Sequence, residues 1–181
     1  MDHRLHKIFR ASLALTVLAG SAFAYSDVLP DAGKQITRLD PAVAFPELPK
    51  NVIAALKTID CKIPQIYGGG KPQNVIRGSF AAKGQMDWAV LCSTQGVSKI
   101  EIYWGGSARC SSEIAPIDDK VVASRAINPL APKLMQGVNR MNEGTIPSPI
   151  SHEGIDDAYD EKASVIHYCN AGKWIELSGS D

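Results

Sequence analysis

Short apolar runs separated by turn residues dominate the chain between positions 75 and 106. Residues 88–92 form a wholly apolar run, which predicts a strand buried on both faces. Residues 98–104 alternate between apolar and polar side chains, which predicts a strand with one buried face. The residues of that buried face are Ile100, Ile102 and Trp104. Because a short turn at 93–96 separates the two runs, the pattern predicts an antiparallel β-meander.

Two segments have the apolar spacing of amphipathic helices. Apolar residues recur at i, i+4 and i+7 in segment 49–60, and at i, i+4 and i+8 in segment 128–140. These residues are Val52, Leu56 and Ile59 in the first segment, and Leu130, Leu134 and Val138 in the second. Asn128 and Pro129 have the types favoured at an N-cap and at the first helical position. The second helix is therefore expected to begin there.

The C-terminal region predicts a further hairpin. Residues 163–169 and 173–177 have strand patterns, and Asn170, Ala171 and Gly172 form a turn signal between them. Residues 121–127 predict one more strand. The whole pattern predicts a mainly β fold with one or two short helices, forming a single domain over residues 49–181. Residues 25–48, rich in Pro, Asp and Ala, are interpreted as an extended N-terminal arm.

Residues 1–24 have the pattern of a secretory signal peptide. The basic residues Arg4, Lys7 and Arg10 precede an uncharged stretch, 11–24, that ends in small residues at the expected cleavage site. That stretch is shorter than the roughly 20 residues that span a bilayer. We therefore expect an exported protein, periplasmic or extracellular, without membrane insertion after cleavage.

The charge balance bears on possible partners. The chain contains 19 basic and 19 acidic residues. Removing the signal peptide removes three basic residues and one acidic residue, which leaves 16 against 18 and a formal charge of −2. Because nucleic-acid binding needs a basic face, no nucleic-acid partner is expected.

All four cysteines follow the predicted signal peptide. An even number in an exported chain predicts two disulfides. The spacings of 31, 18 and 59 residues lack the close pairs of a zinc site. Three connectivities are open. We favour Cys61 with Cys92, which would tie a helix end to a central strand, and Cys110 with Cys169, which would tie the middle of the chain to the C-terminal hairpin.

The segment from 78 to 106 resembles an FG-GAP repeat, the β-propeller blade unit of integrin α-chains and of many secreted bacterial proteins. The matching positions are Gly78, Phe80, Gly84, Asp87, Ala89 and Val90. A weaker likeness begins at Gly154. The resemblance covers about 30 residues well, and it implies an antiparallel meander equivalent to one or two blade units. The same segment is similar to those of short exported bacterial proteins of unassigned role.

The loop of that repeat family uses Asp or Asn side chains to bind Ca²⁺, and this chain departs from the pattern. The residues at those positions are Ser79, Ala81 and Lys83. Ca²⁺ takes six to eight oxygen ligands, so no metal is expected in the loop. The carboxylate of Asp87 is instead expected to accept hydrogen bonds from backbone N–H groups and cap a turn between Gly78 and Gly84.

An acidic run follows His152. Its carboxylates belong to Glu153, Asp156, Asp157, Asp160 and Glu161. The run suggests either a weak Ca²⁺ site over 153–161 or a solvated charged loop. Because the regular ligand spacing of a calcium loop is missing, the solvated loop is the favoured interpretation and no cofactor is expected. His167 is expected to be a structural residue of a strand.

The favoured function is an exported, non-enzymatic binding domain whose partner is another exported protein or a glycan. No nucleophile-elbow or HExxH motif is present. The candidate binding residues are Tyr103, Trp104, His152, Glu153, Asp156 and Asp157. One alternative is an inhibitor or immunity protein of a cell-envelope hydrolase, because a rigid scaffold lowers the entropic cost of docking a loop. A second is a hydrolase with two carboxylates across a cleft.

Overall fold

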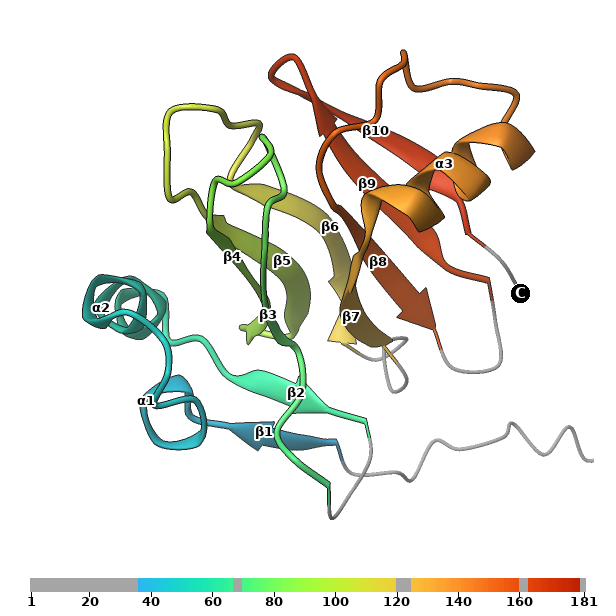
Figure 1. Cartoon of the computed structure of the whole chain (residues 1–181). Helices are drawn as coiled ribbons and strands as arrows, with labels where there is room; N and C mark the ends of the chain where they lie inside the picture. Colours follow the sequence, from blue (N-terminus) through green and yellow to red (C-terminus); the bar gives the residue numbers. More distant parts are fainter. Residues whose placement is uncertain (1–35, 67–69, 120–124, 160–162, 180–181) are drawn as a thin grey trace, which may run out of the picture. The chain divides into compact units, whose positions relative to one another are not determined.

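Two antiparallel sheets of four strands each contain most of the strands in the described part of the chain (Figure 1). The first sheet contains, in spatial order, β3 (Val75–Gly78), β4 (Asp87–Thr94), β5 (Val97–Tyr103) and β6 (Glu113–Asp118). The second contains, in spatial order, β10 (Lys173–Ser178), β9 (Val165–Asn170), β8 (Gly154–Tyr159) and β7 (Arg125–Leu130). A small third sheet pairs β1 (Thr37–Leu39) with β2 (Ile63–Gln65). The helices are α1 (Pro41–Ala44), α2 (Lys50–Thr58) and α3 (Pro132–Met141).

The computed structural model describes residues 36–66, 70–119, 125–159 and 163–179. The prediction of a mainly β, antiparallel fold with short helices is confirmed. Neighbouring strands of each four-stranded sheet are also neighbours in sequence, as in a meander. Many antiparallel sheets share this order, so the resemblance to propeller blades stays a prediction.

Two hairpins turn through two residues with left-handed backbone conformations. Gln95 and Gly96 have φ of +52° and +83° between β4 and β5, and Ala171 and Gly172 have φ of +48° and +82° between β9 and β10. Positive φ at both central residues matches the right-handed twist of the flanking strands. Both turns lie where the sequence predicts them.

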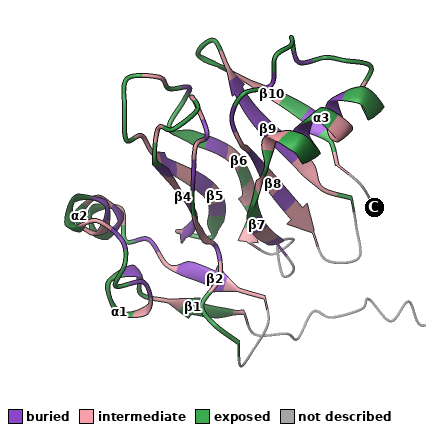
Figure 2. Cartoon of the chain, viewed as in Figure 1, coloured by how far each residue is buried: buried purple, intermediate pink, exposed green. Residues whose placement is uncertain are grey.

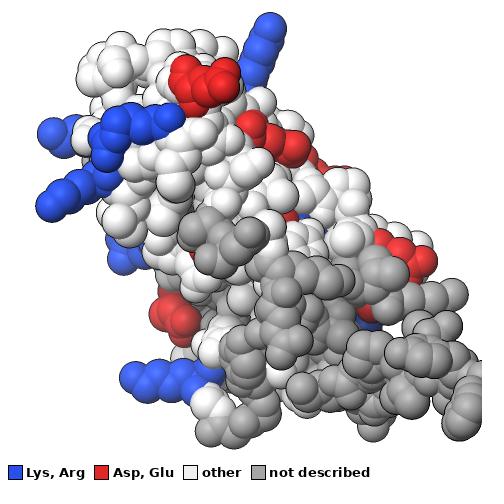
Figure 3. Space-filling view, turned by 90° about the vertical axis from the view of Figure 1, so that its right-hand side faces the viewer, with Lys and Arg blue, Asp and Glu red and all other residues white. Residues whose placement is uncertain are grey.

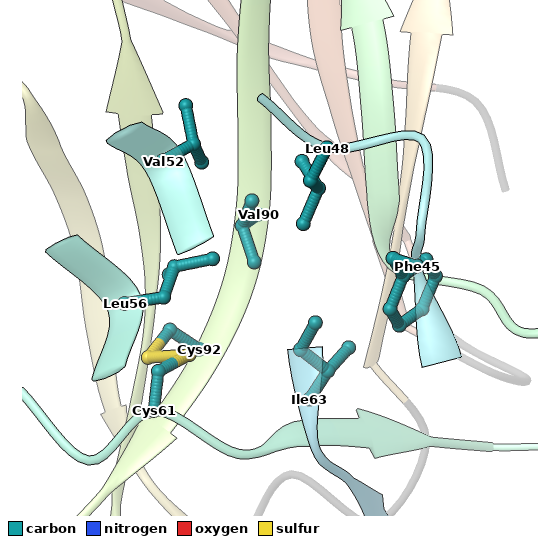
Figure 4. Packing of buried hydrophobic residues seen from close by; sticks show 8 residues of the cluster. All are labelled: Phe45, Leu48, Val52, Leu56, Cys61, Ile63, Val90 and Cys92. Atoms are coloured by element: carbon teal, nitrogen blue, oxygen red, sulfur yellow. A yellow bond between two sulfur atoms is a disulfide. The ribbon is translucent and has the colours of Figure 1, made fainter. Parts of the chain in front are cut away.

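The first core cluster packs α2 against one face of β4 (Figure 4). Val52 and Leu56 of α2 point toward Val90, and the disulfide of Cys61 with Cys92 closes one side of the cluster. The remaining members are Phe45, Leu48 and Ile63. The helical spacing in the sequence therefore predicts both α2 and the face that it buries.

The second core cluster contains side chains of both four-stranded sheets. Ala89 and Leu91 of β4 contribute to it, while Val90 and Cys92 on the opposite face of the same strand contribute to the first cluster. Ile127 of β7 and Ile155 of β8 add the side chains of the second sheet, and the others are Phe80, Ile100, Ile102 and Ile114. β4 is thus buried on both faces, as its apolar run predicts, and Figure 2 shows buried residues along the strands of both sheets.

The predicted extended arm at 25–48 is wrong over its described part, residues 36–48. These residues form β1 and α1 and belong to the same compact unit as the rest of the described chain. Asp40 caps α1 by accepting a hydrogen bond from the Ala42 backbone N–H at 3.0 Å. Phe45 and Leu48 then enter the first core cluster, because their large apolar surfaces gain free energy on burial. Residues 25–35 lie outside the described part.

The predicted start of the second helix is also wrong. Asn128 and Pro129 belong to β7, opposite Asp156 and Ile155 of β8. α3 begins only at Pro132, which takes the early helical position that proline favours. Pairing with β8 therefore overrides the local N-cap signal.

The third core cluster packs α3 against the second sheet. Met135 of α3 is fully buried beside Ile166 and Leu177. Asn139, one turn later, is buried and exchanges two hydrogen bonds with the backbone of Ile146, at 2.9 and 2.7 Å. The core-facing side of α3 is therefore the side of Met135 and Asn139, and the side of Leu134 faces solvent.

Candidate functional site

The carboxylate of Asp87 holds the corner between β3 and β4. It is fully buried, and it accepts hydrogen bonds from the backbone N–H of Phe80 at 3.0 Å and of Gly105 at 2.9 Å. The Gln85 side chain donates a third, at 2.8 Å, and Gly84 supplies a left-handed turn conformation with φ of +80°. The capping hydrogen bonds expected from the sequence are present, and all of the carboxylate's contacts are structural.

Glu153 links the end of β3 to the segment before β8. Its Oε2 accepts a hydrogen bond from the Ser79 N–H at 2.7 Å, and its own N–H donates to the Ser79 carbonyl at 2.9 Å. A Cβ on Gly78 would lie only 2.7 Å from the same Oε2. This close approach requires glycine at position 78, so Gly78 and Glu153 serve the scaffold.

The favoured interpretation of the acidic run as a solvated loop is wrong for residues 154–159, which form the strand β8. Asp156 and Asp157 are neighbours on this strand, so their side chains point to opposite faces of the sheet. Asp157 is buried, and Asp156 is partly exposed. The two acids therefore do not form the carboxylate pair that a glycoside hydrolase needs. Asp160 and Glu161 lie outside the described residues.

Asp157 pairs with a buried arginine. The Nε and Nη2 of Arg125 each donate a hydrogen bond of 2.7 Å to its carboxylate, and Nη1 donates to the Ser98 carbonyl in β5 at 3.1 Å. Both charged side chains are almost completely buried. A bidentate pair of this kind compensates two buried charges and fixes their geometry. Because Ser98 lies in the first sheet, the pair also connects the two sheets.

His167 of β9 completes this buried polar group. Its Nε2 lies 3.6 Å from Asp157 Oδ2, and its Nδ1 lies 3.5 Å from Glu176 Oε1. Neither ring nitrogen has a hydrogen-bond partner among the described residues. The Trp174 ring lies edge-on to the His167 ring, with the two ring centroids 6.4 Å apart. His167 is thus a buried residue of the sheet, as the sequence analysis expects.

Opposing influences act on the pKa of Asp157. Burial raises it, while contacts with His167 and with the Arg125 guanidinium lower it. The lowering contacts prevail, so the pKa stays below the ordinary value of 3.8 and the side chain is ionised at neutral pH. The contacts with His167 and Arg125 thus compensate the carboxylate charge that burial alone would disfavour.

The remaining candidate residues, Tyr103, Trp104 and His152, pack within the fold. Burial raises the pKa of Tyr103 to about 12, with a smaller contribution from Glu101, so the phenol stays protonated. Trp104 stacks on Trp174 with ring centroids 5.9 Å apart. His152 is buried and stacks on Tyr168, with the two ring centroids 4.1 Å apart. Each of these three side chains thus packs on other side chains of the fold.

Within residues 36–66, 70–119, 125–159 and 163–179, no group of three or more His, Cys, Asp or Glu side chains is placed to hold a metal ion. The carboxylate of Asp119 is engaged as well, because Ser93 and Ser98 donate hydrogen bonds to it and Arg38 pairs with it at 3.0 Å. Asp87, Glu153, Asp157 and Asp119 thus all have partners within the fold.

The outward side of α3 lines a shallow groove of about 590 Å³. Its lining residues are Leu130 of β7 and, from α3, Leu134, Gly137, Val138, Arg140 and Met141. We call this surface the outer face of α3. Leu134 is 58% exposed and Met141 is 66% exposed, which is unusual for side chains of this size. Figure 3 shows the side of the molecule on which α3 lies in Figure 1, where Lys and Arg side chains project at the left-hand edge beside a broad uncharged surface.

A smaller groove of about 230 Å³ lies between α1 and α2. Lys62 lies at this groove and pairs with Asp40 at 3.2 Å and with Asp60 at 3.6 Å. Lys62, Asp40 and Asp60 therefore already have partners. This leaves the outer face of α3 as the stronger candidate for a binding surface.

Comparison of the chain with protein-family models, with curated proteins and with solved structures finds no match. In the described part of the chain, no helix has the length and apolar character needed to cross a membrane. The two disulfides join Cys61 to Cys92 and Cys110 to Cys169, which is the pairing that the sequence analysis favours.

Sequence reasoning missed the outer face of α3 as a candidate site. Leu130, Leu134 and Val138 recur at helical spacing, but Leu130 belongs to β7, and Leu130 and Val138 both pack partly against the third core cluster. The same helix contains a second buried pair, Met135 and Asn139, that packs into the core. Of the three residues at helical spacing, Leu134 is therefore the one that the fold leaves largely exposed.

Proposed function

We propose that this chain is an exported, non-enzymatic binding domain that recognises a protein partner through the outer face of α3. One observation carries the proposal: Leu134 and Met141 stand largely in solvent on a helix whose opposite side already packs into the core. Exposed apolar patches of this kind mark interaction sites, because covering them removes apolar surface from water.

Two further features support a binding role outside the cytoplasm. The fold has two disulfides, which persist in oxidising compartments such as the periplasm and the extracellular space. Asp87, Glu153 and Asp157 hold the scaffold together, so they are not offered to a substrate. An inhibitor or immunity protein is one form of the same function, in which the partner is a cell-envelope hydrolase.

Site-specific photocrosslinking tests the proposal. The full chain would be expressed and exported with a benzophenone amino acid at position 134, and crosslinked products would be identified by mass spectrometry. Position 43 is the matched control, because Val43 is an exposed aliphatic residue on another helix, at 82% exposure. We expect one dominant protein adduct at position 134 that is absent at position 43.

Two variants sharpen the result. Leu134→Asp should prevent capture of the partner by a probe at position 141, and Val43→Asp should leave that capture unchanged. Identical adducts at positions 134 and 43, or no protein adduct at position 134, would contradict a protein-binding face on α3. Specific retention of the protein on a glycan array instead would favour a glycan partner.

A further inference from the structure

The outer face of α3 has a gap at its centre. Residues at i, i+4 and i+7 lie along one line of a helix, which places Gly137 between Lys133 and Arg140. Leu134 and Met141 form the neighbouring line, also seven residues apart. Gly137 therefore lies among two basic and two apolar side chains and leaves a hollow where another residue would place a side chain.

The hollow at Gly137 is open. A Cβ built at this position would have a single neighbour within 4 Å, the Arg140 Nη2 at 3.9 Å, which is an ordinary van der Waals distance. Glycine in the middle of a helix costs about 1 kcal/mol relative to alanine. A side chain would thus fit the free protein and stabilise the helix, so neither packing nor φ explains the glycine here. Close approach of another chain does explain it.

Both basic residues beside the hollow are available to a partner. Lys133 and Arg140 are exposed, and neither forms an ion pair with another described residue. They are seven residues apart, which corresponds to about 10 Å along a helix axis at 1.5 Å per residue. The face therefore offers two positive charges at a fixed separation, with an apolar strip beside them.

We propose that the partner presents an amphipathic α-helix with two carboxylates about seven residues apart and an apolar side chain between them. This inference rests on the proposed function. The carboxylates pair with Lys133 and Arg140, and the apolar side chain enters the hollow at Gly137. Packing a ridge of one helix into a groove of another is the usual way in which two helices meet. An extended peptide would gain little here, because backbone hydrogen bonds within α3 leave few groups free to pair with a strand.

Charge argues against a second copy of this chain as the occupant. Two copies of α3 packed antiparallel about Gly137 would place Lys133 of each near Arg140 of the other. Like charges at that distance destabilise an interface. A partner helix of opposite charge avoids this repulsion and gains two charge-assisted hydrogen bonds.

A peptide selection tests the inference without knowledge of the natural partner. The immobilised full chain, oxidised, would be exposed to a displayed library of random 18-residue peptides, with counter-selection against the Leu134→Asp variant. We expect the enriched peptides to show apolar residues at i, i+3 or i+4 and i+7, and an excess of Asp and Glu spaced seven residues apart. Titration of one such synthetic peptide should shift the NMR signals of α3.

Three variants define the contacts. Gly137→Gln fills the hollow with a good helix former, so the melting temperature should stay or rise while peptide affinity falls at least about ten-fold. The double variant Lys133→Glu with Arg140→Glu should no longer bind the acidic peptides. It should instead bind versions of those peptides in which the two acids are changed to lysine. Gln136→Ala, an exposed change on α3 outside the groove lining that alters no charge, is the control and should leave affinity nearly unchanged.

The outcomes separate the inference from the proposed function. Enriched peptides that are basic or have the two-residue period of a strand would overturn the helix proposal, while a crosslinked partner at position 134 would leave the proposed function standing. Binding to vesicles with anionic lipids that is abolished by Leu134→Asp would overturn it in favour of a membrane surface. No α3-dependent peptide and no adduct at position 134 would overturn both.

Discussion

Arg125 of β7 and Asp157 of β8 meet in the interior through two hydrogen bonds of 2.7 Å, with side chains that are 0% and 1% exposed. Removing one member leaves the other charge buried without compensation, which typically costs about 3–5 kcal/mol. Arg125→Met and Asp157→Asn should therefore each lower the free energy of unfolding by about that amount. Chemical denaturation of the purified oxidised protein would measure it.

The double variant Arg125→Met with Asp157→Leu is the informative companion. Replacing both charges by apolar residues removes the uncompensated charge, so its loss should be smaller than the sum of the losses of Arg125→Met and Asp157→Leu measured separately. Arg38→Met is the surface control. Arg38 pairs with Asp119 at 3.0 Å but is 38% exposed, so its loss should be about 1 kcal/mol or less. A double-variant loss equal to the sum of the two single losses would contradict an energetic coupling between Arg125 and Asp157.

The lowered pKa of Asp157 predicts that acid destabilises the fold. Because the folded-state pKa is below 3.8, the native state binds fewer protons than the unfolded state near that pH. The contribution to stability is therefore present above the unfolded value and is lost as the pH falls through the folded value. Asp119 acts in the same direction. Burial raises its pKa, but the hydrogen bonds from Ser93, Ser98 and Arg38 lower it by more, so its folded-state pKa also lies below 3.8.

Denaturation curves recorded from pH 6 down to pH 2 would check this linkage. The free energy of unfolding should fall from about pH 5 downward in the wild type. It should fall less steeply in Asp157→Asn, which has no carboxylate to protonate at that position. An unchanged slope in the variant would show that other groups carry the acid dependence.

Local patterns predicted the parts of the fold whose contacts are close in sequence. The hairpin turns at Gln95 and Ala171, and the burial of Val52 and Leu56, follow from turn chemistry and helical period. The strand β8 escaped prediction because Asp157 looks like a solvated acid until its partner is known. That partner, Arg125, lies 32 residues away in sequence.

The binding surface escaped prediction for a related reason. The pattern around Leu134 predicts a helix, but it does not tell which side packs into the core. That choice is made by the two hydrogen bonds of Asn139 with the Ile146 backbone and by the packing of Met135 on the second sheet. Both are tertiary contacts, and a polar residue such as Asn139 carries no apolar signal of burial.

Asp87 provides a test of the corner between β3 and β4. Asp87→Ala leaves the buried Phe80 N–H without its acceptor, so the free energy of unfolding should fall by about 2–3 kcal/mol. Asp87→Asn keeps one acceptor oxygen and should lose less. Glu47→Ala, an exposed change, should stay within about 0.5 kcal/mol of wild type in the same urea titration. Equal stability of Asp87→Ala and wild type would rule out the capping role.

The two disulfides predict a large effect of reduction. They join residues 31 and 59 positions apart, and loop-closure entropy gives about 4 kcal/mol of stabilisation for each. Paired Cys→Ser variants at either bridge should lower stability by roughly that amount. The oxidised native protein should show no thiol that reacts with Ellman's reagent. Four reactive thiols in the native state would contradict both bridges.

The acidic run from Glu153 to Asp157 predicts indifference to calcium. Glu153 accepts a hydrogen bond from Ser79, and Asp157 is held by Arg125, so neither carboxylate is free to join the six to eight oxygens that Ca²⁺ takes. A ligand that binds only the native state raises stability in proportion to the logarithm of its concentration over its dissociation constant. Millimolar Ca²⁺ should therefore leave the melting temperature within about 1 °C of its value in EDTA, a shift far below 1 kcal/mol for a domain of this size. A rise of several degrees with Ca²⁺ that NaCl of the same ionic strength does not produce would show that the native protein binds Ca²⁺ and would contradict the prediction.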